Sequence, residues 1–377
     1  MLDRAKTLWL SPEKILYCSL SAFDSLNFRG AIIGGEWDRL EKRFEDLDIY
    51  VALRQALREG KDWTDTAFYQ RTLEAINRGE FPWGCADEND LQERCRKFEK
   101  LFQTIKNEGY KSQRELLTSE RLADPLRSED EITISIGRHG DMLFSNGAPR
   151  LAIARLLDLK QIPVKVAVRH PGWMLLRERL FQYAKTRGGI LYQPATHPDL
   201  ADVPASHECE DRFLMIKENM VARKGRLLDI GANLGYFCHR FENEGFECYA
   251  LEDSPTELFF LQRLRRGENR RFKIVGKSIF DWSQVGQIHF DVALALNIFH
   301  HAIKTKDSYH KLISLLQKLR MGELFFETAT EDDPQMTDAY RNYSPSEFVE
   351  FIMQNSVLHK AEVIGKAAGG REIYRLS

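Results

Sequence analysis

The sequence predicts two domains, an α+β domain over residues 1–185 and an α/β domain with a parallel sheet over residues 186–377. Two observations lead to this prediction. From about residue 209 onward, apolar runs of strand length alternate with helical segments, an order typical of a parallel sheet with right-handed crossovers. The length of 377 residues is enough for about two domains, and the glycine- and proline-bearing segment 185–204 is typical of a junction between them.

The composition is that of a globular protein with no strong overall charge. The 54 basic and 56 acidic side chains nearly cancel, so no net field draws the protein to nucleic acid or anionic membrane. The 6 cysteines are scattered, without the close pairs of a zinc or redox site, and we expect reduced thiols. No apolar run is long enough for a signal peptide or a membrane span, so we expect a cytoplasmic location.

The first domain begins with a predicted strand over Lys14–Leu20 and a glycine-rich turn over Gly30–Gly35. Apolar side chains at helical spacing then predict inserted helices over residues 47–57 and 91–105. The alternating β-branched run Glu131–Ile136 predicts a strand, which a turn joins to a second strand, Met142–Phe144. These two strands are expected to form a hairpin.

The run Asn146-Gly147-Ala148-Pro149-Arg150 follows this hairpin and leads into a predicted helix over 151–157 and a strand over 162–168. This series resembles the ParB/sulfiredoxin-like domain, in which a Gly-x-x-Arg turn binds nucleotide phosphates. The early strand, with Arg29 and Gly30, is then the first element of that domain. The resemblance implies that Gly147 and Arg150 hold a phosphate through a backbone N–H and a guanidinium.

Catalysis by this first domain is not expected, because the sequence differs from the catalytic members of the family at the positions that carry their reactive side chains. Members active in phosphate chemistry carry histidines or a cysteine just before the arginine, where this chain has Ala148 and Pro149. The alternative to a nucleotide-binding module is a recognition or scaffolding module with the same fold. A ParB-like nucleotide-binding regulatory protein therefore remains one hypothesis for the whole chain.

The second domain opens with a predicted helix over residues 209–221. Five predicted strands follow, and helices fill the gaps between them. The strands lie at 226–230, 247–251, 272–275, 291–296 and 323–327. Ligands bind parallel sheets of this kind at the carboxyl ends of the strands.

The first of these strands ends in a glycine-rich turn that is suited to a nucleotide-like ligand. Gly231 and Gly235 lack a Cβ, so the backbone can turn sharply and a ligand can approach it closely. A dinucleotide fingerprint places a further glycine where this chain has Asn233. The turn instead resembles motif I of class I S-adenosylmethionine (SAM) methyltransferases. An ordinary strand-turn-helix without a ligand is the alternative.

The resemblance to class I methyltransferases implies a Rossmann-like fold over 186–377 with SAM as cofactor. Asp229 is then the partner of the SAM ammonium, and Glu252, 23 residues later, accepts the ribose hydroxyls. Ser278 and Ile279 lie beside the adenine with Asp281 close by, although the family often has an aspartate in place of Ser278. The remaining implied cofactor residues are Gly231, Asn233, Gly235 and Tyr236 in the turn, Asn297 at the end of the fourth strand, and Arg212, which can reach the methionine carboxylate.

The residues after the fourth strand bear on the methyl acceptor. Methyltransferases that act on exocyclic base nitrogens usually have two prolines and an aromatic residue after the Asn or Asp, and here Ile298 and Phe299 follow. His300 or His301 can accept a proton from an attacking hydroxyl, because an imidazole titrates near pH 6.5. Adjacent helical positions point about 100° apart, so we expect one of them to face the cofactor. Glu327 is expected to orient that histidine or the substrate.

Two further clusters carry weaker hypotheses. The consecutive residues His207–Arg212 point in different directions on a helix, so no metal is expected there, and Ser206 as N-cap explains the acidic first turn. A basic cluster at residues 263–273 can serve an RNA ligand or a solvated surface. We therefore expect O-methylation of a small molecule, a sugar or a glycan intermediate, with an RNA (tRNA) methyltransferase as the alternative. Nucleic acid is the less expected partner.

Overall fold

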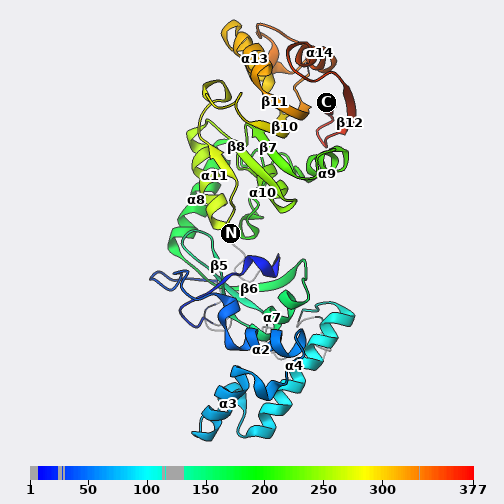
Figure 1. The fold of residues 1–377 in the computed structure, drawn as a ribbon. Coiled ribbons are helices and arrows are strands. Elements are labelled where there is room, and N and C mark those ends of the chain that lie inside the picture. Colours follow the sequence, from blue (N-terminus) through cyan, green and yellow to red (C-terminus); the bar gives the residue numbers. More distant parts are fainter. Residues whose placement is uncertain (1–6, 24–27, 29, 113–114, 116–130, 331) are drawn as a thin grey trace. The chain divides into compact units, whose positions relative to one another are not determined.

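The computed structural model describes residues 7–23, 28, 30–112, 115, 131–330 and 332–377 (Figure 1). It divides into two compact units, Met1–Glu178 and Arg179–Ser377. The division falls inside helix α8 (Pro171–Thr186), before the predicted boundary at residue 186. Since a continuous helix has no linker composition, the sequence carries no signal at this point. Arg29, named above for the ParB-like domain, lies outside the described residues.

The N-terminal unit is built on a six-stranded sheet in which the order β1-β6-β4-β5-β2 is extended by β3 pairing with β6. The predicted β4–β5 hairpin is confirmed as an antiparallel pair. The predicted strand over 14–20 is largely wrong: only β2 is extended there, because Pro12–Lys14 forms a 3-10 turn capped by Ser11. The strands are β1 (Leu8–Leu10), β2 (Tyr17–Cys18), β3 (Ala31–Ile32), β4 (Thr133–Ile136), β5 (Met142–Asn146) and β6 (Ile162–Arg169).

The helices of this unit follow the predicted apolar periodicity. α2 (Asp48–Leu57) and α4 (Glu88–Glu108) confirm the two predicted helical insertions. Between them lies α3 (Ala67–Asn77), and α7 (Ala148–Leu156) follows the hairpin. Asp87 is the N-cap of α4. Its side chain accepts a hydrogen bond from the N–H of Asp90 at 2.9 Å, which satisfies one of the unpaired donors of the first turn.

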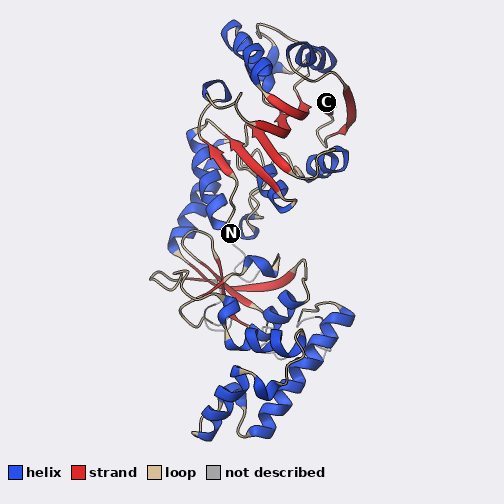
Figure 2. Cartoon of the chain, viewed as in Figure 1, coloured by secondary structure: helices blue, strands red, loops and turns tan. Residues whose placement is uncertain are grey.

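The C-terminal unit contains a seven-stranded sheet of order β12-β13-β11-β10-β7-β8-β9, flanked by helices (Figure 2). The strands β7 to β11 are parallel, and β13 runs antiparallel to both β11 and β12. All five predicted strands are confirmed, and with them the α/β class with a parallel sheet. Their bounds are β7 (Gly225–Ile230), β8 (Phe246–Leu251), β9 (Lys273–Val275), β10 (His289–Leu296), β11 (Arg320–Glu327), β12 (Ala361–Lys366) and β13 (Glu372–Leu376).

Each face of this sheet is covered by its own apolar core. Side chains of a strand alternate between the faces, so Leu228 and Ile230 join one core while Leu227 joins the other. Asp229 falls on the same face as Leu227, which is the face that α10 covers. The helices are α9 (Glu210–Asn219), α10 (Tyr236–Asn243), α11 (Pro255–Gly267), α12 (Phe299–Ala302), α13 (Lys306–Lys318) and α14 (Pro345–Asn355).

Two smaller features complete the fold. α9 begins at Glu210 after Cys209, so the prediction that Ser206 caps it is wrong; the Ser206 hydroxyl donates instead to the Tyr192 carbonyl at 3.2 Å.

None of the helices in the described part of the chain has the length and apolarity needed to cross a bilayer.

Candidate functional site

The turn after β7 places glycine backbone, which no side chain covers, at the edge of the sheet where the parallel strands end. Gly231 and Asn233 have positive φ angles of 75° and 52°. The N–H groups of Gly231 and Ala232 both donate to the Leu251 carbonyl at the end of β8, at 2.9 Å each. A Cβ on Gly231 would lie 2.9 Å from Cδ1 of Ile298, closer than side chains tolerate. Glycine is therefore required here both by the backbone conformation and by the close approach of the segment after β10.

Gly231→Ala is expected to weaken binding of any ligand at this edge and to destabilise the fold by about 1–2 kcal/mol through its left-handed conformation alone. Gly245→Ala is a matched control, because Gly245 has φ 90° and nothing within 4 Å of an added Cβ. Thermal unfolding and SAM titration of both variants separate the two effects. A Gly231→Ala variant that unfolds like Gly245→Ala and binds SAM as wild type would show that the close approach is unimportant.

Glu252 is fixed at the end of β8 by two backbone donors. Its Oε2 accepts from the Asn233 N–H at 2.8 Å and its Oε1 accepts from the Ser254 N–H at 2.9 Å. Burial raises the pKa of this carboxyl, which is 7% exposed. A carboxylate has about four acceptor positions, so each oxygen keeps capacity for a hydrogen bond from a ligand. The carboxylate is thus held in one orientation before any ligand arrives.

Two adjoining cavities open at this edge. The larger has a volume of about 540 Å³ and the smaller about 280 Å³, and they share Gly231, Asp253, Ile298 and His301. The smaller cavity is further lined by Ser278, Ile279 and apolar residues such as Leu251 and Phe299. Most residues that line the larger one have polar or charged side chains, and the full lining is Tyr192, His207, Arg212, Gly231, Asn233, Glu252, Asp253, Ser254, Glu257, Leu296, Asn297, Ile298, His300, His301, Gln335, Gly369 and Arg371.

The structure brings most of the predicted site residues to these two cavities. Seven of them line the larger cavity, and Ser278 and Ile279 line the smaller. Asp281 is exposed at the end of the 3-10 turn Ile279–Asp281. Tyr236 donates its hydroxyl to Glu210 at 2.6 Å. Within the C-terminal unit, the five predicted residues outside both linings are Asp229, Gly235, Tyr236, Asp281 and Glu327.

Asp229 lies behind the turn rather than on its cavity side. It is 3% exposed, and its Oδ2 accepts from the Cys238 thiol of α10 at 3.9 Å. Burial, and then the charge of Glu252, raises the pKa of Asp229 to about 7. Asp229 lines neither cavity, because strand alternation turns this side chain toward α10, and its pairing with an ammonium stays a prediction.

Arg212 and Glu327 form a buried ion pair beside the larger cavity. The Arg212 Nε and Nη2 donate to Glu327 at 2.7 and 2.9 Å, and the two side chains are 5% and 0% exposed. Glu327 Oε1 also accepts from Asn297 Nδ2 at 3.0 Å, and Asn297 Oδ1 accepts from Arg371 at 2.8 Å. The partners described for the Glu327 carboxylate are Arg212 and Asn297, not a histidine, and its expected role in orienting the histidine or the substrate stays a prediction.

The two histidines both line the larger cavity, and which of them faces the cofactor stays a prediction. Their rings lie 4.0 Å apart between centroids. His300 Nε2 lies 3.1 Å from Gln335 Oε1, and His301 Nδ1 lies 3.3 Å from Lys304 Nζ. Burial, then His301 and Lys304, lowers the pKa of His300 to about 3, and burial lowers the pKa of His301. Both rings are neutral at physiological pH.

Several lining residues were not predicted from the sequence. Tyr192 comes from the segment interpreted as a domain junction, His207 comes from the cluster 207–212, and the centroids of their rings lie 4.7 Å apart. Arg371 comes from the turn between β12 and β13, near the end of the chain. Gln335 comes from the short 3-10 turn Pro334–Met336. No local motif marks these residues, since each reaches the cavity through a tertiary contact.

The predicted phosphate-binding residues of the N-terminal unit lie at the start of α7. Gly147 is its N-cap with φ 89°, and its N–H donates to Asn146 Oδ1 at 2.8 Å. Arg150 is half-buried in the first turn of that nine-residue helix. Nucleotide binding here remains a prediction.

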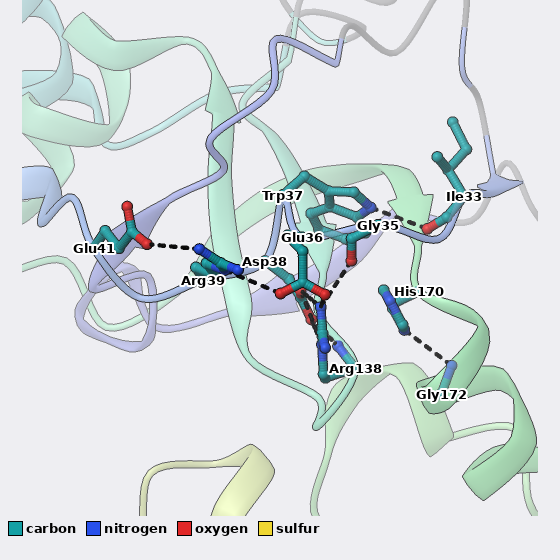
Figure 3. Close-up of polar contacts among 10 residues, drawn as sticks. All are labelled: Ile33, Gly35, Glu36, Trp37, Asp38, Arg39, Glu41, Arg138, His170 and Gly172. Atoms are coloured by element: carbon teal, nitrogen blue, oxygen red, sulfur yellow. Dashed lines mark hydrogen bonds and ion pairs between the residues drawn. The ribbon is translucent and has the colours of Figure 1, made fainter.

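A second polar cluster in this unit joins the glycine-rich segment 30–38 to the β4–β5 turn (Figure 3). Arg138 donates through Nε to both oxygens of Asp38, at 3.0 and 2.9 Å, and through Nη2 to the Gly35 carbonyl at 2.7 Å. Burial acts to raise the pKa of Asp38, but the hydrogen bonds from Arg138 outweigh it and lower that pKa. This ion pair fixes the two loops to each other.

Part of the basic cluster at 263–273 is engaged by contacts within the unit, where Arg270 and Lys273 pair with acidic side chains. Arg265 Nε donates to the Phe272 carbonyl at 2.6 Å, and Lys273 Nζ donates to Glu247 at 2.6 Å. Arg270 pairs with Glu242 at 3.6 Å. These partners reduce the positive charge that the cluster presents to a phosphate backbone, so the RNA alternative gains no support from it.

Comparisons with known proteins gave structural likenesses but no family. No protein-family model matches the chain, and no curated protein matches it. The bifunctional kinase-methyltransferase WbdD is similar with a TM-score of 0.44 and 18% identity, over 52% of this chain and 46% of that one. The chain thus matches less than half the length of WbdD.

Two other solved structures are similar over a comparable part of this chain. The PH0226 protein of Pyrococcus horikoshii OT3 has a TM-score of 0.38 at 12% identity, covering 52% of this chain and 98% of that chain. The 1,6-didemethyltoxoflavin-N1-methyltransferase of Burkholderia thailandensis, solved with S-adenosylhomocysteine, has a TM-score of 0.37 at 16% identity, covering 55% and 88%.

Proposed function

We propose that the C-terminal unit is a SAM-dependent methyltransferase. The observation that carries this proposal is the fixed Glu252 carboxylate at the carboxyl edge of the sheet, where it lines the larger of two adjoining cavities, both of which Gly231 also lines. A nucleoside needs an acceptor for its ribose hydroxyls, a close backbone and an apolar slot for its base. These three features occur together here, each formed by a different loop.

The residues present fit SAM in a definite order along the cavities. Glu252 accepts the ribose hydroxyls, and Ser278 and Ile279 flank the adenine in the smaller cavity. The methionine part extends toward Asn297, whose amide is fixed by Glu327 and Arg371. Bound SAM supplies a methyl group on a positively charged sulfur. The acidic wall formed by Glu252 and Asp253 favours that positive charge.

The acceptor proposed for this site is a hydroxyl of a small molecule, a sugar or a glycan intermediate. The larger cavity offers polar contacts from Tyr192, His207 and the His300–His301 pair. Neutral imidazoles can accept the hydrogen bond of a hydroxyl and can take its proton as the methyl group transfers. The chain's own contribution is to hold the acceptor oxygen in line with the methyl group and to exclude water.

Either His300→Ala or His301→Ala is expected to keep SAM affinity and to lose turnover by a factor of about 10²–10⁴, as removal of a general base does. Because the pKa values of both imidazoles are lowered, the unprotonated form persists on acidification. Turnover should therefore hold below pH 6.5, where an ordinary histidine becomes protonated. Normal turnover in both variants would make the pair structural.

The experiment that tests the proposed function is methyl transfer from labelled SAM to fractionated cell metabolites, followed by mass identification of the product. The proposal expects one fraction to gain a methyl group, with no transfer by a Glu252→Gln variant. Transfer to no fraction, or equal transfer by that variant, would count against it.

The N-terminal unit is proposed to be a ParB/sulfiredoxin-like module that recognises a nucleotide or the substrate. The left-handed Gly147 at the start of α7, with Arg150 in its first turn, supports this proposal. Titration of labelled nucleotides should show binding to the wild type and a loss in Arg150→Ala. Equal or absent binding in both proteins would reduce this unit to a scaffold.

A further inference from the structure

Arg371 lines the larger cavity with part of its guanidinium unused. Nη1 donates to Asn297 Oδ1 at 2.8 Å, and Nη2 donates to Asp333 Oδ2 at 2.9 Å. A guanidinium has five N–H donors, and no described residue accepts from the others. The side chain is 28% exposed, and its Nε is not among the buried polar atoms that lack a partner. Arg371 therefore has donors left for a ligand.

The turn between β12 and β13 fixes the backbone that carries this guanidinium. The Ala367 N–H donates to the Arg371 carbonyl at 2.9 Å, and the Gly370 N–H donates to the Ala367 carbonyl at 2.7 Å. The turn is also joined to the first turn of α9, because the Ala368 N–H donates to Asp211 Oδ2 at 2.8 Å. Hydrogen bonds within the turn and to α9 thus hold Arg371 in place.

Arg371 approaches the cavity from the half of the sheet opposite to the proposed cofactor residues. In the strand order β12-β13-β11-β10-β7-β8-β9, Gly231, Glu252 and Ser278 follow β7, β8 and β9. Arg371 immediately precedes β13, toward the other end of this order, and its guanidinium reaches Asn297 after β10. It therefore lies beyond the proposed positions of the ribose and the adenine, on the side that remains for the methyl acceptor.

A second positive charge, that of Lys304, lies on the same side of the cavity. Its Nζ is 3.3 Å from His301 Nδ1 and 3.4 Å from Gln335 Oε1, two residues of the cavity wall. Lys304 makes no ion pair with a described residue. Burial lowers the pKa of His207, and the charge of Arg371 is among those that lower it further. This side of the cavity therefore favours an anion, in contrast to the acidic wall that faces the cofactor sulfur.

We propose that Arg371 binds an anionic group of the methyl acceptor, so that the acceptor carries a carboxylate or a phosphate as well as the hydroxyl that is methylated. An arginine recognises either oxyanion through paired N–H donors. Asp333 shares the guanidinium and offsets part of its charge. The inference rests on the proposed function and narrows its substrate class to anionic compounds.

Anion binding is measured on the full chain with inorganic phosphate at constant ionic strength. Arginine is labelled with ¹⁵N, and the Nε–H resonance of Arg371 is identified by its loss in Arg371→Met. Phosphate should shift this resonance saturably, whereas the resonance of Arg223, an exposed arginine of the same unit, should not saturate. Asp333→Asn should bind phosphate roughly three- to tenfold more tightly, because it removes a nearby negative charge. No saturable shift at Arg371, or no gain in Asp333→Asn, would overturn the proposal.

A second measurement separates the methyl acceptor from the cofactor, whose methionine part also carries a carboxylate. Methylthioadenosine keeps the nucleoside of S-adenosylhomocysteine but lacks the amino acid. The ratio of the two affinities, measured by calorimetry, should be the same in Arg371→Gln as in the wild type. A loss confined to S-adenosylhomocysteine would assign Arg371 to the cofactor carboxylate and overturn the proposal. Binding of neither compound to the wild type would contradict the proposed function alone, because phosphate binding is measured without a nucleoside.

Turnover identifies the anion. The metabolite fraction that gains a methyl group should be retained by an anion exchanger at neutral pH. Arg371→Gln should raise KM for that fraction by about ten- to hundredfold, the effect of losing a charged hydrogen bond, and Arg371→Lys should recover part of this loss. Loss of the fraction's acceptor activity after phosphatase treatment would identify a phosphate, and its survival a carboxylate. An uncharged methyl acceptor would overturn the proposal.

Discussion

Replacing Glu327 by alanine is expected to destabilise the protein by about 3–5 kcal/mol, the usual cost of removing one partner of a buried ion pair. Arg212 is only 5% exposed on its side chain and both of its bonded nitrogens donate to Glu327. The substitution leaves that guanidinium charged and unpaired inside the unit. Asn297 loses the acceptor for its amide at the same time.

Urea unfolding of the wild type and of Glu327→Ala measures this loss. Glu247→Ala is the control, because Glu247 makes an exposed pair with Arg226 and should change stability by no more than about 1 kcal/mol. The double variant Arg212→Met/Glu327→Leu should recover much of the loss, since it removes both charges and fills the space. A loss in Glu327→Ala no larger than in the control would contradict the buried ion pair.

Asp229→Asn is expected to make the protein more stable than the wild type above pH 7. Burial raises the pKa of Asp229 from 3.8 to about 7 in the folded state. The folded protein therefore holds this proton more tightly than the unfolded chain. This tighter proton binding stabilises the folded state in full below about pH 4, and the stabilisation is lost as the pH rises through 7. The ionised carboxylate then costs up to about 4 kcal/mol, which the neutral amide avoids.

The melting temperature between pH 5 and pH 8 tests this effect. The wild type should lose stability over that range relative to Asp229→Asn, while the exposed variant Asp281→Asn should follow the wild type. If the melting temperatures of the wild type and Asp229→Asn changed in parallel with pH, ionisation of Asp229 would not destabilise the folded state. Another group would then compensate for the burial of its charge.

The parallel strands of the C-terminal unit could be predicted because each contains a short apolar run, and β7, β8, β10 and β11 are mostly buried on both faces. The glycine turn after β7 could be predicted for a related reason: a backbone with positive φ and a close neighbour allows few residues. β12 escaped prediction because most of its side chains are exposed and no apolar run forms.

The acceptor end of the site could not be predicted in the same way. Arg371 and Gln335 lie in turns whose local sequence carries no motif, and they meet Asn297 and His300 only after the sheet has formed. The burial of Asp229 depends on which face of β7 receives α10. Charge pairs such as Arg212 with Glu327, 115 residues apart, are likewise set by the fold.

The most direct test of the account is a calorimetric titration of the full chain with SAM and with S-adenosylhomocysteine. We predict one-to-one binding of both, and a loss of about tenfold or more in Glu252→Gln, because hydrogen bonds to a charged carboxylate contribute about 1.5–3 kcal/mol. Glu218→Gln, an exposed substitution on α9, should bind as the wild type does. Absence of binding to the wild type, or equal affinity of the wild type and Glu252→Gln, would contradict the central claim.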